Sequence, residues 1–133
     1  MHSTPSAKLL WSNRSNPGTT LAASGNSGNT PIDLRYVNSL WLAVSVTAAT
    51  GTNPTLDVYL DLQDAAGNWL TQILHATPQL TGAGSASGSA GLHLPSGTGL
   101  MPVVLPEYGR ISWTVGGTAT PTFTGTVVSL YGR

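Results

Sequence analysis

Hydrophobic and polar residues alternate along several segments of this chain, and the alternation predicts β-strands. Residues 39–50 read SLWLAVSVTAAT, with a large aliphatic side chain at every second position from Leu40 to Val46. Successive side chains of a strand point to opposite faces. The spacing therefore predicts one face that lies in a core and a second face, beginning with Trp41, that is half covered.

The next segment alternates more regularly and predicts a hairpin. Residues 56–64 (LDVYLDLQD) place leucine and valine inward and Asp57, Tyr59 and Asp61 on an outward, solvated face. The letters DAAGN that follow predict a short hairpin loop, in which the glycine supplies a left-handed conformation. Residues 69–75 (WLTQILH) predict the partner strand.

Weaker signals lie before and after this hairpin. Residues 8–12 (KLLWS) predict a first strand, and residues 1–38 as a whole predict an arm with weak strands that belongs to the same unit as a core over residues 39–133. Residues 80–91 (LTGAGSASGSAG) are rich in glycine and serine. This composition predicts either a mobile surface loop or a segment that is ordered only by contact with a neighbour.

The C-terminal part predicts further strands, and no segment of about ten residues has helical spacing. Residues 92–94 predict a short strand, and residues 101–105 (MPVVL) carry a proline that predicts a sheet edge. Residues 110–115 and 122–131 predict the last two strands, separated by a turn over residues 116–120. Together these segments predict an all-β fold, a two-layer antiparallel β-sandwich or jelly roll with an extended N-terminal arm.

Composition narrows the class of function. The 133 residues suit one domain, and only 8% are charged, against a usual value of about 25%. Five basic and five acidic residues cancel, so we expect no nucleic-acid partner and no membrane partner. The start of the chain predicts no secretory leader, and no segment predicts a membrane helix. A protein with so little charge stays dispersed more easily when it is packed against a partner.

Candidate catalytic groups are few. The histidines are His2, His75 and His93, and neither a G-x-S-x-G motif nor a nucleophile–base–acid pattern accompanies them. Glu107 could pair with an aspartate as in a glycosidase, but no spacing supports this. The G-x-G patterns precede no helix and no Walker lysine, so they predict turns. We expect no catalytic residue and no enzymatic activity.

The candidate metal ligands are Asp57, Asp61 and Asp64, carboxylates of the kind that calcium prefers. Alternating acids also occur on any solvated strand face, and this interpretation is favoured. We therefore expect no metal and no cofactor, with calcium as the alternative. Eight aromatic side chains offer a sugar-stacking platform, although aromatics on strands more often belong to a core or an interface. They are Trp11, Trp41, Trp69, Trp113, Tyr36, Tyr59, Tyr108 and Tyr131.

Residues 56–81 and 110–133 carry a resemblance. The letters DAAGNW between two strands, the step QLTGAG and the final pair RISWTVGGTATPTFT with a Gly-Arg end resemble small β-sandwich proteins of tailed-bacteriophage virions. The resemblance implies a capsid decoration (cement) protein on the capsid exterior, made in the host cytoplasm. It also implies two partners, the major capsid protein and further copies of the chain, with a homotrimer favoured.

The arm is where we expect contact with the shell or an adjacent subunit, because such segments order on contact. The interface candidates are Leu9, Leu10, Trp11, Leu34, Tyr36, Tyr59 and Leu92. Two alternatives remain open at this point. One is a carbohydrate- or receptor-binding module of a tail fibre, and the other is a head–tail neck accessory protein.

Overall fold

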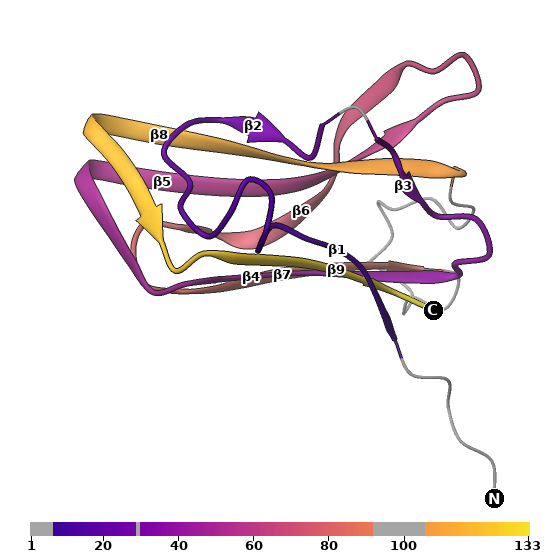
Figure 1. Cartoon of the computed structure of the whole chain (residues 1–133), viewed down its shortest axis with the longest axis horizontal. Coiled ribbons are helices and arrows are strands. Elements are labelled where there is room, and N and C mark those ends of the chain that lie inside the picture. Colours follow the sequence, from indigo (N-terminus) through magenta and orange to yellow (C-terminus); the bar gives the residue numbers. More distant parts are fainter. Residues whose placement is uncertain (1–6, 29, 92–105) are drawn as a thin grey trace, which may run out of the picture.

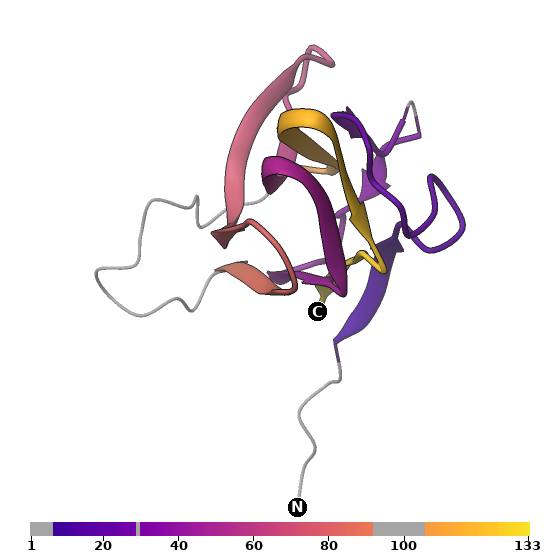
Figure 2. The ribbon, with the colours of Figure 1, turned by 90° about the vertical axis from the view of Figure 1, so that its left-hand side faces the viewer.

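The computed structural model describes residues 7–28, 30–91 and 106–133, and every regular element in them is a β-strand. The strands are β1 (Lys8–Ser12), β2 (Gly25–Asn26), β3 (Ile32–Asp33), β4 (Ser39–Val46), β5 (Ala48–Gln63), β6 (Trp69–Leu80), β7 (Gly84–Gly91), β8 (Tyr108–Thr124) and β9 (Val127–Gly132). They form an antiparallel nine-stranded sheet in the order β1-β9-β4-β7-β6-β5-β8-β2, and β3 also pairs with β8. The sheet curls, so that β5 and β8 face β4 and β9 (Figures 1 and 2). The expected all-β, antiparallel fold is thereby confirmed.

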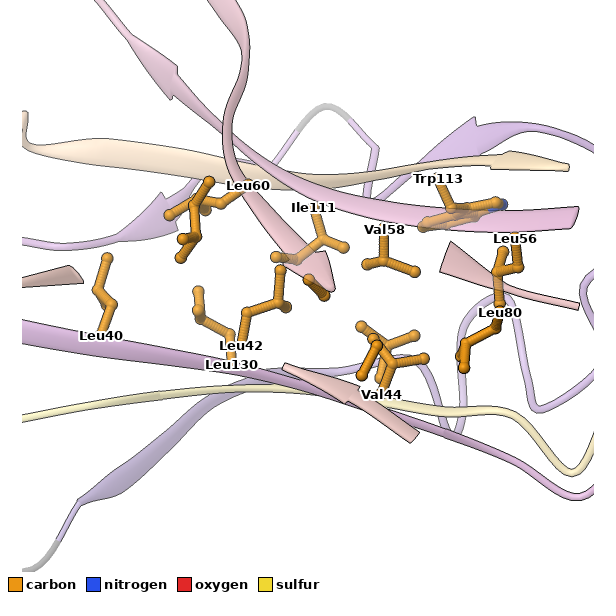
Figure 3. Close-up of a cluster of buried hydrophobic side chains, with 14 of the residues drawn as sticks. Leu40, Leu42, Val44, Leu56, Val58, Leu60, Leu80, Ile111, Trp113 and Leu130 are labelled. Carbon is orange, nitrogen blue, oxygen red and sulfur yellow. The ribbon is translucent and has the colours of Figure 1, made fainter. Parts of the chain in front are cut away.

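The two facing parts of the sheet share one hydrophobic core. On β4, Leu40, Leu42 and Val44 are at most 3% exposed, as the alternation predicts. Figure 3 shows Leu42 and Leu130 pointing from β4 and β9 toward Ile111 of β8. Burial of each such aliphatic side chain contributes about 1.5–3 kcal/mol. The period-two pattern therefore supplies most of the driving force for folding.

The sheet turns a corner inside β5 and β8, and residues 116–120, where the sequence predicts a turn, lie within β8. Both strands bend together at the left end of Figure 1. Gly51 and Gly117 have φ of 101° and 114°, and the register between β5 and β8 shifts beside Thr52. The prediction that residues 116–120 reverse the chain is thus wrong, because these residues bend the continuous strand β8. The true reversal comes after Thr124 and divides the predicted last strand between β8 and β9.

Residues 84–91 form β7, so the alternative of a mobile surface loop is wrong there. β7 pairs with β4 along its whole length. Its letters GSASGSAG alternate, with Ala86 and Ala90 only 6% and 1% exposed. A Cβ on Gly88 would lie 2.7 Å from the carbonyl oxygen of His75 on β6. Small residues are required because β6 passes close to this strand.

The N-terminal segment reaches both edges of the sheet. β1 pairs with β9, whereas β2 and β3 pair with β8. The edges approach each other, since Trp11 of β1 stacks on Trp113 of β8 with ring centroids 6.4 Å apart. Between the strands, Leu21 bridges to Phe123, and Leu21 and Leu34 are both 2% exposed. The strands predicted over residues 92–94 and 101–105 lie outside the described residues.

Candidate functional site

A shallow hollow of about 450 Å³ lies on the outer face of β4, β7 and β9. The cross-strand register sets its shape. Ala43 of β4 lies opposite Ser87 of β7 on one side and Ser129 of β9 on the other. All three line the hollow, and their short side chains form its floor. The depression exists because three adjacent strands carry small residues at the same level.

An aromatic pair forms one end of the hollow. Trp41 of β4 lies opposite Tyr131 of β9, one row away from the floor residues. Their rings stack, with centroids 5.6 Å apart and planes 28° from parallel. Trp41 remains 49% exposed. Leu9 of β1 lies opposite Tyr131 and extends this row, at 52% exposure.

The other end of the hollow is polar and carries a positive charge. Ser45, Ser85 and Val127 form the row beyond the floor, and Thr77 and Arg14 also line the hollow. None of the chain's five acidic residues lines it. The arginine forms no ion pair with any residue that the structure describes. The hollow therefore combines hydroxyl groups, an aromatic surface and one unpaired cation.

The outer face of β5, β6 and β8 differs from the hollow, because it carries carboxylates that are hydrogen-bonded to other groups of the chain. Asp61 is 0% exposed, which corrects the expectation of a solvated carboxylate. It accepts hydrogen bonds from the backbone N–H of Gln72 at 2.8 Å, the hydroxyl of Ser112 at 3.1 Å and Nε of Arg110 at 2.9 Å. Gln72 has a φ of 59°, in the irregular part of the β5–β6 pairing. This irregularity brings the β6 backbone to the carboxylate.

A second group on this face surrounds Asp57. Its carboxylate lies 3.0 Å from Nε2 of His75 and accepts a hydrogen bond of 2.7 Å from Nε2 of Gln79. Tyr59 stacks on His75 with ring centroids 4.6 Å apart. Burial, and next the negative charge of Asp57, raise the pKa of Tyr59 above its ordinary value. The group holds a histidine and a carboxylate together, but no described serine or threonine hydroxyl bonds to the histidine.

Asp64 stabilises the hairpin loop between β5 and β6 through hydrogen bonds. Its carboxylate accepts hydrogen bonds from the backbone N–H groups of Ala66 at 2.9 Å and Asn68 at 2.8 Å. These bonds, the one from Asn68 first, lower the pKa of Asp64. Gly67 has a φ of 87°, as the hairpin prediction requires. Asp57, Asp61 and Asp64 thus have separate partners, and no metal-binding group of three His, Asp or Glu side chains occurs in the described part of the chain.

The interface candidates differ in their exposure. Leu34 is buried in the core, while Leu10 and Trp11 are half-buried and pack against it. Leu9 and Tyr36 are exposed at 52% and 97%, and both belong to the N-terminal segment. Tyr59 is half-buried against His75. Leu92 lies outside the described residues, as do His2 and His93.

Sequence reasoning did not bring together the residues of the hollow. Trp41 stands on the half-covered face that the alternation predicts, but its pairing with Tyr131 depends on strands 90 positions apart. Ser87 lies in the glycine- and serine-rich segment, for which a mobile surface loop was one of two predictions. The alternation of serine with alanine and glycine in GSASGSAG is the signal that could have identified a strand with a hydroxyl-bearing face.

Comparisons with protein-family models, with curated proteins and with solved structures find no match to this chain. Within residues 7–28, 30–91 and 106–133, no helix is long and apolar enough to cross a membrane. The proposals that follow rest on the side chains, on their geometry and on the resemblance of residues 56–81 and 110–133.

Proposed function

We propose that this chain is a non-catalytic virion structural protein that binds the outside of a phage capsid as a decoration (cement) protein. Its partners in this proposal are the major capsid protein and further copies of itself, arranged as a trimer. The resemblance of residues 56–81 and 110–133 to virion β-sandwich proteins supports the proposal. A surface with few charges, on a rigid sheet, suits contact with a large assembly.

One observation carries the proposal, namely that Tyr36 is exposed on a strained backbone. Its side chain is 97% exposed, and its backbone has a φ of 69°. A tyrosine in the left-handed region costs free energy, and an exposed ring recovers little of this through packing within the chain. A contact with another molecule would recover it, because tyrosine is enriched at interfaces. Leu9, exposed on the edge strand β1, adds a second apolar contact on the same N-terminal segment.

Repeated attachment makes such small contacts sufficient. Each copy contributes a modest apolar contact, and copies held together in a trimer bind with a high effective concentration. Two or three weak contacts per assembly then sum to tight binding without an extensive interface on each copy. In this proposal the N-terminal arm therefore contacts the capsid shell or the neighbouring subunit.

The experiment uses point variants rather than a deletion. Residues 7–38 contain three strands and the buried Leu21 and Leu34, so their removal would also remove part of the core. A chain carrying both Leu9→Ser and Tyr36→Ser is sedimented with capsids of the encoding phage prepared without this protein. Leu70→Ser is the matched control, since Leu70 is also exposed, at 47%, but lies on β6.

We expect the wild-type chain and the Leu70→Ser control to sediment with the capsids, and the double variant to bind at least about tenfold more weakly. Equal binding of the double variant would overturn the role of the arm. Electron microscopy of the phage particle tests the location. Density for the chain on the neck or on a tail fibre, and none on the capsid exterior, would overturn decoration.

We also infer that the curled sheet is a two-layer sandwich of the jelly-roll type. The inward side chains of β4 and β9 oppose those of β5 and β8 (Figure 3), and β6 pairs with β7 through Thr77 and Ser87. In solution, nuclear Overhauser contacts between the methyl groups of Leu42 and Ile111 are expected, and backbone contacts between β6 and β7 should be confined to the neighbourhood of Thr77 and Ser87, which includes the close approach of Gly88 to His75. A continuous ladder of β6–β7 contacts would instead indicate a closed barrel.

A further inference from the structure

We propose that the hollow on β4, β7 and β9 binds an acidic saccharide, a sugar carrying a carboxylate group. Tyr36 does not line this hollow, and the inference does not depend on the capsid role. It rests on the shape of the hollow, the aromatic pair, the free hydroxyl groups and the unpaired arginine. Each of these selects a property of the ligand.

The shape selects a small ring. The volume of about 450 Å³ falls within the range of about 300–1,000 Å³ that is usual for small-molecule sites. The floor of Ala43, Ser87 and Ser129 lies between a row with two aromatic rings and a row that contains Val127. Because the floor belongs to three paired strands, its form is set before a ligand arrives. A preformed site loses little conformational freedom on binding.

The aromatic pair selects a ligand with an apolar face. Trp41 is 49% exposed although it is large and apolar, and stacking on Tyr131 restrains its ring. Aromatic rings of this kind offer a broad apolar surface with a polar edge. The C–H face of a sugar ring can pack on such a surface while its hydroxyl groups point away.

The hydroxyl groups select a polar partner. Ser45, Ser85 and Ser87 are exposed on the outer face, and their side chains make no hydrogen bond to the residues that the structure describes. A serine hydroxyl both donates and accepts, and so does a sugar hydroxyl. Several such groups around a small floor can therefore bond to several sugar hydroxyls at once.

The charge selects a carboxylate. Arg14 lines the hollow without an ion-pair partner in the described chain, and none of the five acidic residues lines it. A guanidinium binds a carboxylate through two parallel hydrogen bonds, which fix orientation as well as adding affinity. A neutral sugar would leave this cation without a counter-charge. An acidic sugar satisfies all four features of the hollow.

The experiment measures binding of two acidic probes, a galacturonic acid trisaccharide and sialyllactose, to the full chain by titration calorimetry. Galactotriose and lactose are the neutral counterparts. We expect at least one acidic probe to bind, and its neutral counterpart to bind at least about tenfold more weakly. Failure of both acidic probes to bind at millimolar concentration would overturn the proposal, and so would equal binding of acidic and neutral sugars.

Variants locate the site. Arg14→Gln is expected to reduce acidic-probe affinity to that of the neutral sugar, whereas Lys8→Gln, which changes a cation outside the hollow, should leave it unchanged. Trp41→Ala should abolish binding of both kinds of sugar. Ser87→Val fills the floor with a residue that strands favour, so it tests the same site should Trp41→Ala fold poorly. Unchanged affinity of Arg14→Gln or of Ser87→Val would overturn the assignment.

Two further measurements distinguish sugar binding from self-association through the hollow and from capsid decoration. Light scattering over a range of concentrations reports whether a second copy covers the hollow. If the chain self-associates, binds no sugar and loses its self-association in Trp41→Ala, the hollow binds a second copy of the chain and not a saccharide. Sedimentation of Arg14→Gln with capsids should match that of the wild-type chain, so failure of sugar binding and failure of decoration are distinguishable.

Discussion

Asn13 and Val128 exchange two hydrogen bonds although they are 115 positions apart in the chain. The N–H of Val128 donates to Oδ1 of Asn13 at 2.8 Å, and the N–H of Asn13 donates to the carbonyl of Val128 at 3.3 Å. Nδ2 of Asn13 also donates to the carbonyls of Thr126 at 2.9 Å and Gly18 at 3.0 Å. One fully buried carboxamide thus fastens the N-terminal segment to β9.

Replacing this carboxamide should destabilise the protein. Asn13→Leu keeps the approximate volume but leaves the N–H of Val128 and two carbonyls without their partner, so we expect a loss of about 2–4 kcal/mol in the free energy of unfolding. Urea unfolding measures it. Asn38→Leu is the control, because Asn38 is exposed, and it should change the value by less than about 0.5 kcal/mol. Equal unfolding midpoints for the two variants would contradict the role of Asn13.

Gly88→Ala tests the close approach of β6 and β7. The added methyl group would lie 2.7 Å from the His75 carbonyl oxygen and 3.1 Å from Cδ1 of Leu74, so the strands must separate. We expect a loss of about 1–3 kcal/mol. Gly82→Ala has no heavy atom within 4 Å of the new Cβ and should be nearly neutral. Thermal or urea unfolding of both variants measures the difference, and an equally stable Gly88→Ala would disprove the crowding.

Asp61→Ala tests the buried ion pair with Arg110. Asp61 and Arg110 have side-chain exposures of 1% and 21%, so removal of the acid leaves a poorly solvated cation, and we expect a loss of about 3 kcal/mol. Asp33→Ala is a matched control, because Asp33 also lies 2.9 Å from an arginine, Arg35, but both side chains are about half exposed. Its effect on the urea midpoint should be clearly smaller, since solvent screens exposed pairs. Similar losses in the two variants would show that burial is unimportant here.

Tyr59 should give the protein an alkaline pH dependence. Burial, and then the charge of Asp57, raise its pKa above 10.0 in the folded chain. An unfolded tyrosine ionises at about pH 10, so stability is lost as the pH rises from there. Tyr59→Phe should remove this part of the loss, and Tyr36→Phe, at an exposed ring, should not.

Tyrosinate absorbance provides an independent measure of the same group. The wild-type chain should contain a tyrosine whose pKa is raised above 10.0. Asp57→Asn should lower the pKa of Tyr59 only part of the way, because burial is the larger cause. An unchanged titration curve in Tyr59→Phe would show that another tyrosine is responsible.

Local patterns were sufficient for much of the fold. The alternation from Leu40 to Val46 identified β4 and its buried face, since a strand's side chains alternate whatever its neighbours are. The loop between β5 and β6 was predictable for a similar reason, because a glycine is required at a left-handed position and Gly67 occupies it. Much less of the candidate site could be predicted from the sequence, which indicated only that Trp41 lies on a half-covered face.

By itself, the sequence determined that segments such as residues 39–46 are extended and which of their faces is apolar, because these properties depend on side chains two positions apart. The tertiary structure decided the rest. It made a strand of residues 84–91, buried Asp61 against Arg110, and set Trp41 beside Tyr131 over a floor of small residues. Each of these depends on the register between distant strands, which is fixed by the packing of the whole curled sheet and not by any local pattern.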